Sequence, residues 1–158
     1  LAMAPDTRLT LRQSNSNSAR KSSVSFLSLK QGRARFYVKP RPEFSTFYFK
    51  VQTETAFVKA QAADFVIKAD PGKTEISAFE NSRLEVTSLA VPEEVHFLSD
   101  YQRAVFSPGS ASPVVKTVSP IDAQVLMAEF NLVPDNTLFA SGSTDYRVQD
   151  ITEETLED

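Results

Sequence analysis

The chain has 158 residues, of which 41% are apolar, and a net charge of −3 at neutral pH. This length suits one domain with an appended segment and is enough to bury a real core. The absence of cysteine excludes disulfides, thiol catalysis and Cys-ligated zinc, and no run approaches the roughly 18 apolar residues of a membrane span.

Charge is distributed unevenly along the chain. Residues 1–50 carry ten Lys and Arg against two acidic residues, whereas residues 51–158 carry seven against eighteen. Attraction between the two halves is the simpler interpretation, and a basic surface that faces a partner is the alternative. Nucleic acid is not expected as a partner, because the chain as a whole is acidic.

The first third of the chain alternates apolar and polar residues, as strands do. Strands are predicted at Thr7–Arg12 and Val24–Lys30. The polar segment Asn15–Ser23 between them is expected to be a loop or a hairpin tip. Gln31-Gly32 is predicted to turn the chain into a further strand, Arg33–Lys39.

This last strand has two faces of different chemistry. Its inward side chains are Ala34, Phe36 and Val38, and its outward stripe is formed by Arg33, Arg35, Tyr37 and Lys39. Such a stripe can follow an anionic polymer or a carboxylate-rich protein. A solvated face of an antiparallel sheet is the plainer interpretation. These four outward residues are the candidate binding residues.

A loop or sheet edge is predicted at Pro40-Arg41-Pro42, because neither proline can donate to a ladder. Phe47 and Phe49 then fit the inward face of a strand that continues through Val51. Core packing is the simpler role for these rings, and an aromatic platform for sugars is the alternative.

Alternation is most regular over residues 53–86, where three short strands and two turns are predicted. The inward set begins with Ala56, Val58, Ala60 and Ala62. It moves to odd positions from Phe65 onward, so we expect a corner or bulge near residues 62–64. The two turns are placed at residues 70–73 and 80–82.

This segment resembles a known family. Residues 53–66 are TETAFVKAQAADFV and residues 74–86 are TEISAFENSRLEV. They are similar to the signature of the FecR-type domain, T-P-T-A-V-V-G-V-R-G-T-E-F-x-V followed by T-x-V-x-V-x-E-G-x-V-x-V. Weaker similarity extends upstream to Ala4 and downstream to about Phe106.

The sequence departs from the family pattern at several glycines. Lys59 and Ala62 stand at glycine positions, and Asn81 replaces the glycine after Glu80. Asparagine tolerates a positive φ, so the turn at Asn81 is expected to persist. The resemblance therefore implies a divergent member of the family.

Beyond residue 90 the predicted elements are shorter. A turn is expected at residues 91–94, and a final hairpin is expected to join Val95–Phe97 to Tyr101–Phe106. Residues 107–118 have the composition of a linker. Ser119 and Pro120 then form a typical helix start, with a Ser N-cap and Pro at the first helical position.

The helix is expected to end before Pro134 and to dock on the β domain or on a partner, because three turns are marginal alone. Its predicted apolar stripe is Ile121, Val125, Met127/Ala128 and Leu132. The remainder is polar and acidic, with Thr137–Phe139 and Tyr146–Val148 as a possible added strand.

Catalytic and metal-binding patterns are missing from the sequence. The single histidine, His96, lies between Val95 and Phe97 and is expected to be a half-buried packing residue, because no second His or Cys can complete a metal set or a triad. No phosphate-binding loop or zinc-protease motif occurs. We therefore expect a protein that is not an enzyme and has no cofactor and no metal.

The predicted organisation is an all-β domain at 1–106, a linker at 107–118, and a helix with an acidic tail at 119–158. Strand spacing suits a two-layer β-sandwich or a β-solenoid-like stack, and the resemblance favours the solenoid-like form. The resemblance also implies that the sequence begins partway into its domain.

For function, the resemblance implies a periplasmic or otherwise exported domain that recognises an envelope protein, a transporter or regulator, in signal relay to a sigma/anti-sigma system. Recognition is expected by strand addition near Pro40–Phe49 or through the 119–132 helix. The alternative is a structural module that binds peptidoglycan or another cell-wall polymer through the outward stripe.

Overall fold

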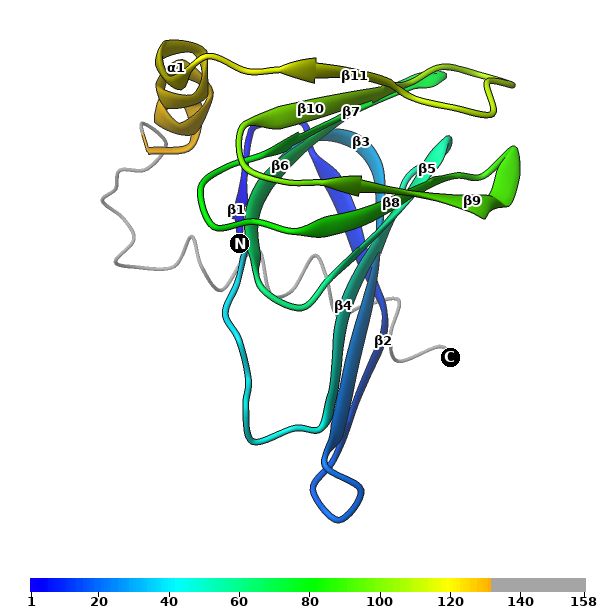
Figure 1. The fold of residues 1–158 in the computed structure, drawn as a ribbon, viewed down its shortest axis with the longest axis vertical. Helices are drawn as coiled ribbons and strands as arrows, with labels where there is room; N and C mark the ends of the chain where they lie inside the picture. The colour runs from blue at the N-terminus through cyan, green and yellow to red at the C-terminus, as the bar shows by residue number, and fades with distance from the viewer. Residues whose placement is uncertain (132–158) are drawn as a thin grey trace.

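The computed structural model describes residues 1–131, and every regular element within them except one helix is a β-strand (Figure 1). The strands are, in chain order, β1 (Ala2–Met3), β2 (Arg8–Asn17), β3 (Ser22–Val38), β4 (Thr46–Gln52), β5 (Ala56–Ala60), β6 (Ala63–Asp70), β7 (Lys73–Ala78), β8 (Leu84–Ser88), β9 (Val91–Leu98), β10 (Gln102–Phe106) and β11 (Val114–Thr117). The helix is α1 (Pro120–Asn131). The predicted all-β class with one short helix is confirmed.

The strands form one sheet that curls into a half-barrel (Figure 1). We call β2-β3-β4-β5-β8-β9 the first arm of this sheet, and β1 with β3-β6-β7-β10-β11 the second arm. The long strand β3 belongs to both arms. Among the described residues β3 and β4 run parallel, and the other ladders are antiparallel. The solenoid-like form is not confirmed.

The strand β3 passes from one arm to the other at Gly32. This residue has φ +99°, and pairing continues on both sides of it: Gln31 faces Arg8 on β2, and Gly32 faces Ala69 on β6. The predicted turn at Gln31-Gly32 is therefore wrong, and the glycine bends a single strand of 17 residues. A bend suffices because each half of β3 finds partner strands of its own.

Residues 53–86 form four strands, β5 to β8, instead of the three predicted. The predicted corner lies at Gln61-Ala62, between β5 and β6. Ala62 is half-buried and Ala63 takes the buried position, so the assignment of Ala62 to the inward set is wrong by one residue. The turn before β8 places Asn81 at φ +58°, as expected for a residue that replaces glycine.

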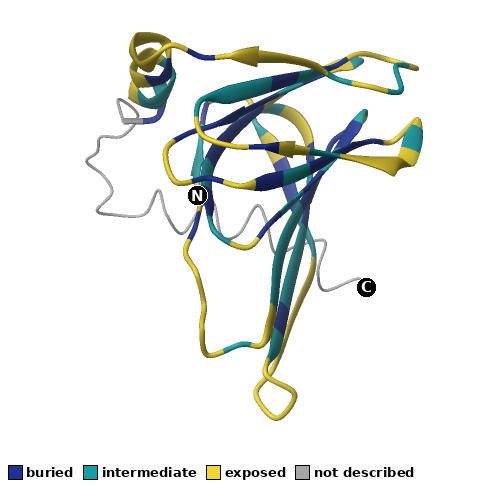
Figure 2. Cartoon of the chain, viewed as in Figure 1, coloured by how far each residue is buried: buried dark blue, intermediate teal, exposed yellow. Residues whose placement is uncertain are grey.

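The inward side chains of both arms fill one core. The stretches of chain that carry buried residues are dark blue in Figure 2. Its largest fully buried members are Phe36, Phe65, Phe106, Leu29, Ile67, Ile76, Leu84, Leu98, Val51 and Val58. Phe36 joins the two arms, because its ring centroid lies 5.2 Å from that of Phe65 on β6 and 5.6 Å from that of Phe49 on β4. Phe47 and Phe49 pack against this core, which confirms the packing interpretation.

The last strands depart from the predicted hairpin. The chain reverses at Leu89-Ala90, so residues 91–94 belong to β9 and are not a turn. β9 pairs with β8 and β10 pairs with β7, so residues 99–101 carry the chain from the first arm to the second. Within the segment 107–118, predicted as a linker, Val114–Thr117 pairs with β10 as β11.

The helix α1 begins as predicted: the Ser119 hydroxyl accepts a hydrogen bond from the backbone N–H of Asp122 at 3.1 Å. It packs on the outer face of the second arm, which confirms the expected docking on the β domain. The predicted apolar stripe makes only part of this contact: Met127 packs against the sheet, whereas Ile121 and Val125 are 73% and 61% exposed. Leu132 lies outside the described residues.

A different face of α1 is buried. Its contact residues are Ala123, Leu126, Met127 and Phe130, and they meet Ala2, Ala4, Val66, Phe79, Tyr101 and Val118. The helix is therefore apolar on two sides, and periodicity alone could not select the side that docks.

Replacing Phe130 with alanine is expected to release α1 from the sheet. Phe130 is buried on the second arm, and a three-turn helix without tertiary packing is marginal in water. The free energy of opening of α1 should fall by about 2 kcal/mol, measured by amide hydrogen exchange. Val125→Ala on the exposed side is the matched control, and equal loss of protection in both variants would contradict this docking face.

The predicted strands at Thr137–Phe139 and Tyr146–Val148, and the rest of the acidic tail, lie outside the described residues. Within residues 1–131, no helix combines the length and the apolar character that crossing a membrane requires.

Candidate interaction surface

The outward stripe predicted on β3 lies on the outer face of the second arm, and two of its four residues are engaged within the chain. Arg33 forms an ion pair with Glu129 of α1. Arg35 donates to both carboxylate oxygens of Asp64, at 2.9 and 2.7 Å, and its guanidinium lies 5.6 Å from the ring centroid of Phe79. The hydrogen bonds to Asp64 raise the pKa of Arg35 above its usual value.

The other two stripe residues face solvent. Tyr37 is 61% exposed, and the ammonium of Lys39 lies 5.8 Å from the centroid of the Tyr37 ring. The stripe is therefore divided into an inner part that holds α1 and the corner in place, and an outer pair that is accessible. Its role in binding stays a prediction.

Asp64 also anchors the corner between β5 and β6. Ser82 accepts a hydrogen bond from the backbone N–H of Asp64 and donates one to its carbonyl, both at 2.8 Å. The backbone N–H of Ser82 in turn donates to the Asp100 carboxylate at 2.9 Å. Asp64 thus links β3, the turn after β7 and the turn after β9, which is a structural role that sequence reasoning missed.

The threonines of the family-like TETA segment also have a structural role. Thr74 on β7 is buried, and its hydroxyl lies 2.7 Å from the hydroxyls of both Thr53 and Thr55. Thr53 also accepts from the backbone N–H of Ala56 at 3.0 Å. These bonds fix the start of β5 against β7 of the other arm.

Replacing Thr74 with valine is expected to lower the free energy of unfolding by about 2 kcal/mol, because the buried Thr53 hydroxyl loses a partner. Chemical denaturation would measure the change. Thr46→Val at the exposed start of β4 is the control and should alter stability by less than about 0.5 kcal/mol. Equal effects would show that the buried hydroxyls contribute nothing specific.

The outer face of the first arm carries a cluster of accessible aromatic and charged side chains. Across neighbouring strands, Lys59 on β5 faces Glu85 on β8, and Glu85 faces Phe97 on β9. Two residues away on each of the same strands, Phe57 faces Thr87, and Thr87 faces Val95. Phe97 and Val95 are 56% and 48% exposed.

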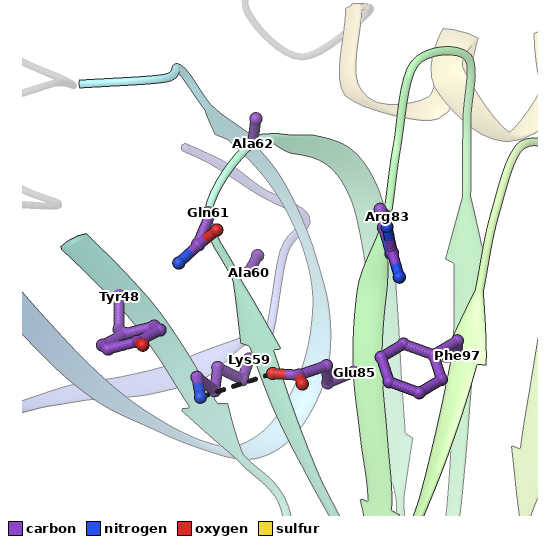
Figure 3. A pocket seen from close by; sticks show the side chains of 8 residues that line it. All are labelled: Tyr48, Lys59, Ala60, Gln61, Ala62, Arg83, Glu85 and Phe97. Carbon is purple, nitrogen blue, oxygen red and sulfur yellow. Dashed lines mark ion pairs between the residues drawn. The ribbon is translucent and has the colours of Figure 1, made fainter. Parts of the chain in front are cut away.

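Two shallow grooves lie on this face and share Lys59 and Glu85. The first, about 390 Å³, is lined by Tyr48, Arg83 and Phe97 among others, and Figure 3 shows Lys59 between Tyr48 and Glu85. The second, about 430 Å³, is lined chiefly by apolar residues, namely Phe57, Leu89, Pro92 and Val95. Because they share two residues, we treat them as one trough, here called the first-arm trough.

Cations in the trough contact aromatic rings. The Lys59 ammonium lies 4.0 Å from the Tyr48 ring centroid and 3.4 Å from a Glu85 carboxylate oxygen. The Arg83 guanidinium lies 5.4 Å from the Phe97 ring centroid, and no carboxylate of residues 1–131 is within 4.0 Å of it. These contacts hold the charged groups over the rings at the surface, where an incoming carboxylate can reach them.

Strand addition near Pro40–Phe49, predicted from the prolines, is not available in this fold. Residues 39–45 form a connection, and β4 is paired on both sides, with β3 and with β5. An added strand needs unpaired backbone groups at a sheet edge. The prediction is wrong because the parallel pairing with β3 turned an apparent edge into an interior strand.

Groups suited to catalysis do not converge in the described part of the chain. His96 is half-buried, as predicted, with its Nε2 4.0 Å from a Glu94 carboxylate oxygen. Within residues 1–131 no three His, Asp or Glu side chains are grouped so as to hold a metal ion.

Comparison with known proteins identifies the family. The fold is similar to two crystal structures, at 2.50 and 1.65 Å resolution, of candidate anti-sigma factors from Parabacteroides distasonis, each with a TM-score of 0.53 and 20% identity. The alignments cover 66% and 79% of this chain, but only 46% and 58% of those proteins, so the chain spans about half of their length. No curated protein matches the chain.

The family model described as FecR protein matches residues 1–82, just over half of the 158 residues. The resemblance found over residues 53–86 is thereby confirmed, although the match ends earlier than the expected Phe106. This chain belongs to the FecR protein family.

Proposed function

We propose that this chain is a non-catalytic, exported domain that recognises a protein in an envelope signalling pathway that relays to a sigma/anti-sigma system. Membership of the FecR family supports a signalling role. The two similar structures are described as candidate anti-sigma factors, and this description is consistent with such a role. The partner is an envelope transporter or regulator.

The observation that carries this proposal is the first-arm trough. Exposed aromatic side chains beside an arginine are typical of protein interfaces, where aromatic residues and Arg are enriched, and Tyr and Arg are frequent among the residues that dominate binding energy. Phe97 is 56% exposed under the Arg83 guanidinium, and Val95 and Leu89 extend the apolar surface along β9 and the end of β8. Leaving the apolar surface of Phe97, Val95 and Leu89 in water does not stabilise the fold of the isolated domain.

The test is transcript profiling in the organism that carries this chain. Deletion of the gene should change a set of sigma-dependent transcripts, and the wild-type chain should restore them. Phe97→Asp should fail to restore them, whereas Val115→Asp on exposed β11 should succeed. An unchanged profile after deletion, or full restoration by Phe97→Asp, would contradict the proposal.

Export is testable because the chain has no cysteine. Ser18→Cys, in the exposed tip between β2 and β3, introduces the one thiol of this sequence. We expect labelling by a maleimide that does not cross the inner membrane when it is added to intact cells. Labelling only after lysis would place the domain inside the cell.

A second candidate function, binding of a cell-wall polymer through Arg33, Arg35, Tyr37 and Lys39, is supported by the exposed Tyr37 and Lys39 pair. Because Arg33 and Arg35 already bind Glu129 and Asp64, only Tyr37 and Lys39 of the four make no ion pair within residues 1–131. Salt-sensitive cosedimentation with peptidoglycan that is lost in Tyr37→Ala would favour this function. Equal cosedimentation of Tyr37→Ala and the wild-type chain would exclude the stripe as the peptidoglycan-binding site.

A further inference from the structure

The two arms of the sheet differ in what covers their outer faces. On the second arm, α1 buries Phe130 and Ala123 against Val66 and Phe79. On the first arm, no described element lies over the trough, although it too presents apolar side chains. The same sheet thus shows one outer face with a helix on it and one without.

The contact of α1 shows which chemistry such a face accepts. Phe130 supplies apolar contact, and the neighbouring Glu129 forms an ion pair with Arg33 on the sheet. A helix with an apolar face and a carboxylate at its margin therefore matches an outer face that combines apolar residues with an arginine.

The first-arm trough also combines apolar residues with an arginine, and it has a charged end and an apolar end. At one end is Arg83 with its aromatic partner Phe97, and in the middle Lys59 pairs with Glu85, which is the single carboxylate of residues 1–131 that lines the trough. At the other end are Leu89 and Val95 with little charge. From Arg83 to Leu89 the trough is about 20 Å long at about 3.3 Å per strand residue, which corresponds to roughly 13 residues of α-helix.

We propose that the first-arm trough binds an acidic amphipathic helix of a second protein. The helix lies along the trough, with a carboxylate at Arg83 and Lys59 and with apolar side chains over Phe57, Leu89 and Val95. This inference rests on the proposed function and specifies the chemistry of the partner. Charge complementarity sets its direction, because only one end of the trough is cationic.

Photo-crosslinking in living cells provides the first test. p-Benzoylphenylalanine is placed at Val95 in the trough, and at Val115 on β11 as a control of nearly equal exposure. We expect a second protein to be crosslinked from Val95 and not from Val115. Peptide mapping should place the crosslink in a segment whose apolar residues recur every three or four positions and whose flank is acidic.

Charge exchange with the purified partner provides the second test. Arg83→Glu should weaken binding on the order of tenfold or more, and changing the facing acid of the partner to Lys should restore most of the affinity. Lys116→Glu, the same charge change on exposed β11, should leave the affinity unchanged. Circular dichroism of each variant separates loss of binding from loss of fold.

The outcomes separate this inference from the proposed function. A crosslinked protein segment that is extended or lacks acids overturns the helix and leaves protein recognition standing. Crosslinks confined to a second copy of this chain or to a saccharide overturn the inference, as does normal binding by Arg83→Glu. If, in addition, gene deletion leaves transcripts unchanged, the proposed function fails as well.

Discussion

Replacing Phe36 with alanine is expected to lower the free energy of unfolding by about 4 kcal/mol. Phe36 is 1% exposed, and it lies directly opposite Phe65 in the β3–β6 ladder, where the two rings stack at 5.2 Å. Its other ring contact, with Phe49, crosses to the first arm. The substitution therefore removes apolar contact within the second arm and between the two arms at once.

The size of this loss is large against the 5–15 kcal/mol that stabilises a typical domain. Denaturant unfolding followed by far-ultraviolet circular dichroism would measure it. Phe97→Ala removes the same atoms from a side chain that is 56% exposed, and it should change stability by less than about 0.5 kcal/mol. A loss below about 1 kcal/mol in Phe36→Ala would mean that the arms do not share a packed core.

Gly32→Ala is expected to destabilise the fold by about 3 kcal/mol, through the backbone and not through the core. Gly32 has φ +99°, and a Cβ added there would lie 2.5 Å from the Thr7 Cα. The Thr7 backbone would have to move, because 2.5 Å is closer than two carbon atoms that are not bonded to each other can approach. Thr7 cannot retreat freely, because its hydroxyl accepts from the Arg33 N–H at 3.1 Å and donates to the Arg33 carbonyl at 3.0 Å.

Gly109→Ala separates the two causes of this loss. Gly109 has φ +69° with no atom within 4 Å of an added Cβ, so only the conformational strain of about 1 kcal/mol applies. Thermal unfolding of both variants should rank Gly32→Ala well below Gly109→Ala. Equal melting temperatures would mean that β3 does not need the close approach of Thr7 in order to bend.

The outward stripe and the first-arm trough show why the sequence predicted the binding surfaces only in part. The alternation of Arg33, Arg35, Tyr37 and Lys39 correctly placed the first three side chains on one face of β3, and Lys39 follows directly after the strand ends at Val38. It could not show that Asp64, 29 residues away, and Glu129, 96 residues away, neutralise the first two. The sequence did not predict the trough, because its residues come from β4, β5, β8 and β9. No single stretch of the chain contains its combination of aromatic, apolar and charged residues.

Local patterns in the amino-acid sequence determined most of the strands, the corner near Ala62, the Ser119 cap and the need for a positive φ at Asn81, because each depends on residues a few positions apart. Tertiary structure alone decided the bend of β3 at Gly32, the side of α1 that docks and the separation of β9 from β10. Those features depend on which distant strand supplies the hydrogen bonds and the apolar contacts. A residue's own neighbours in sequence carry no information about that choice.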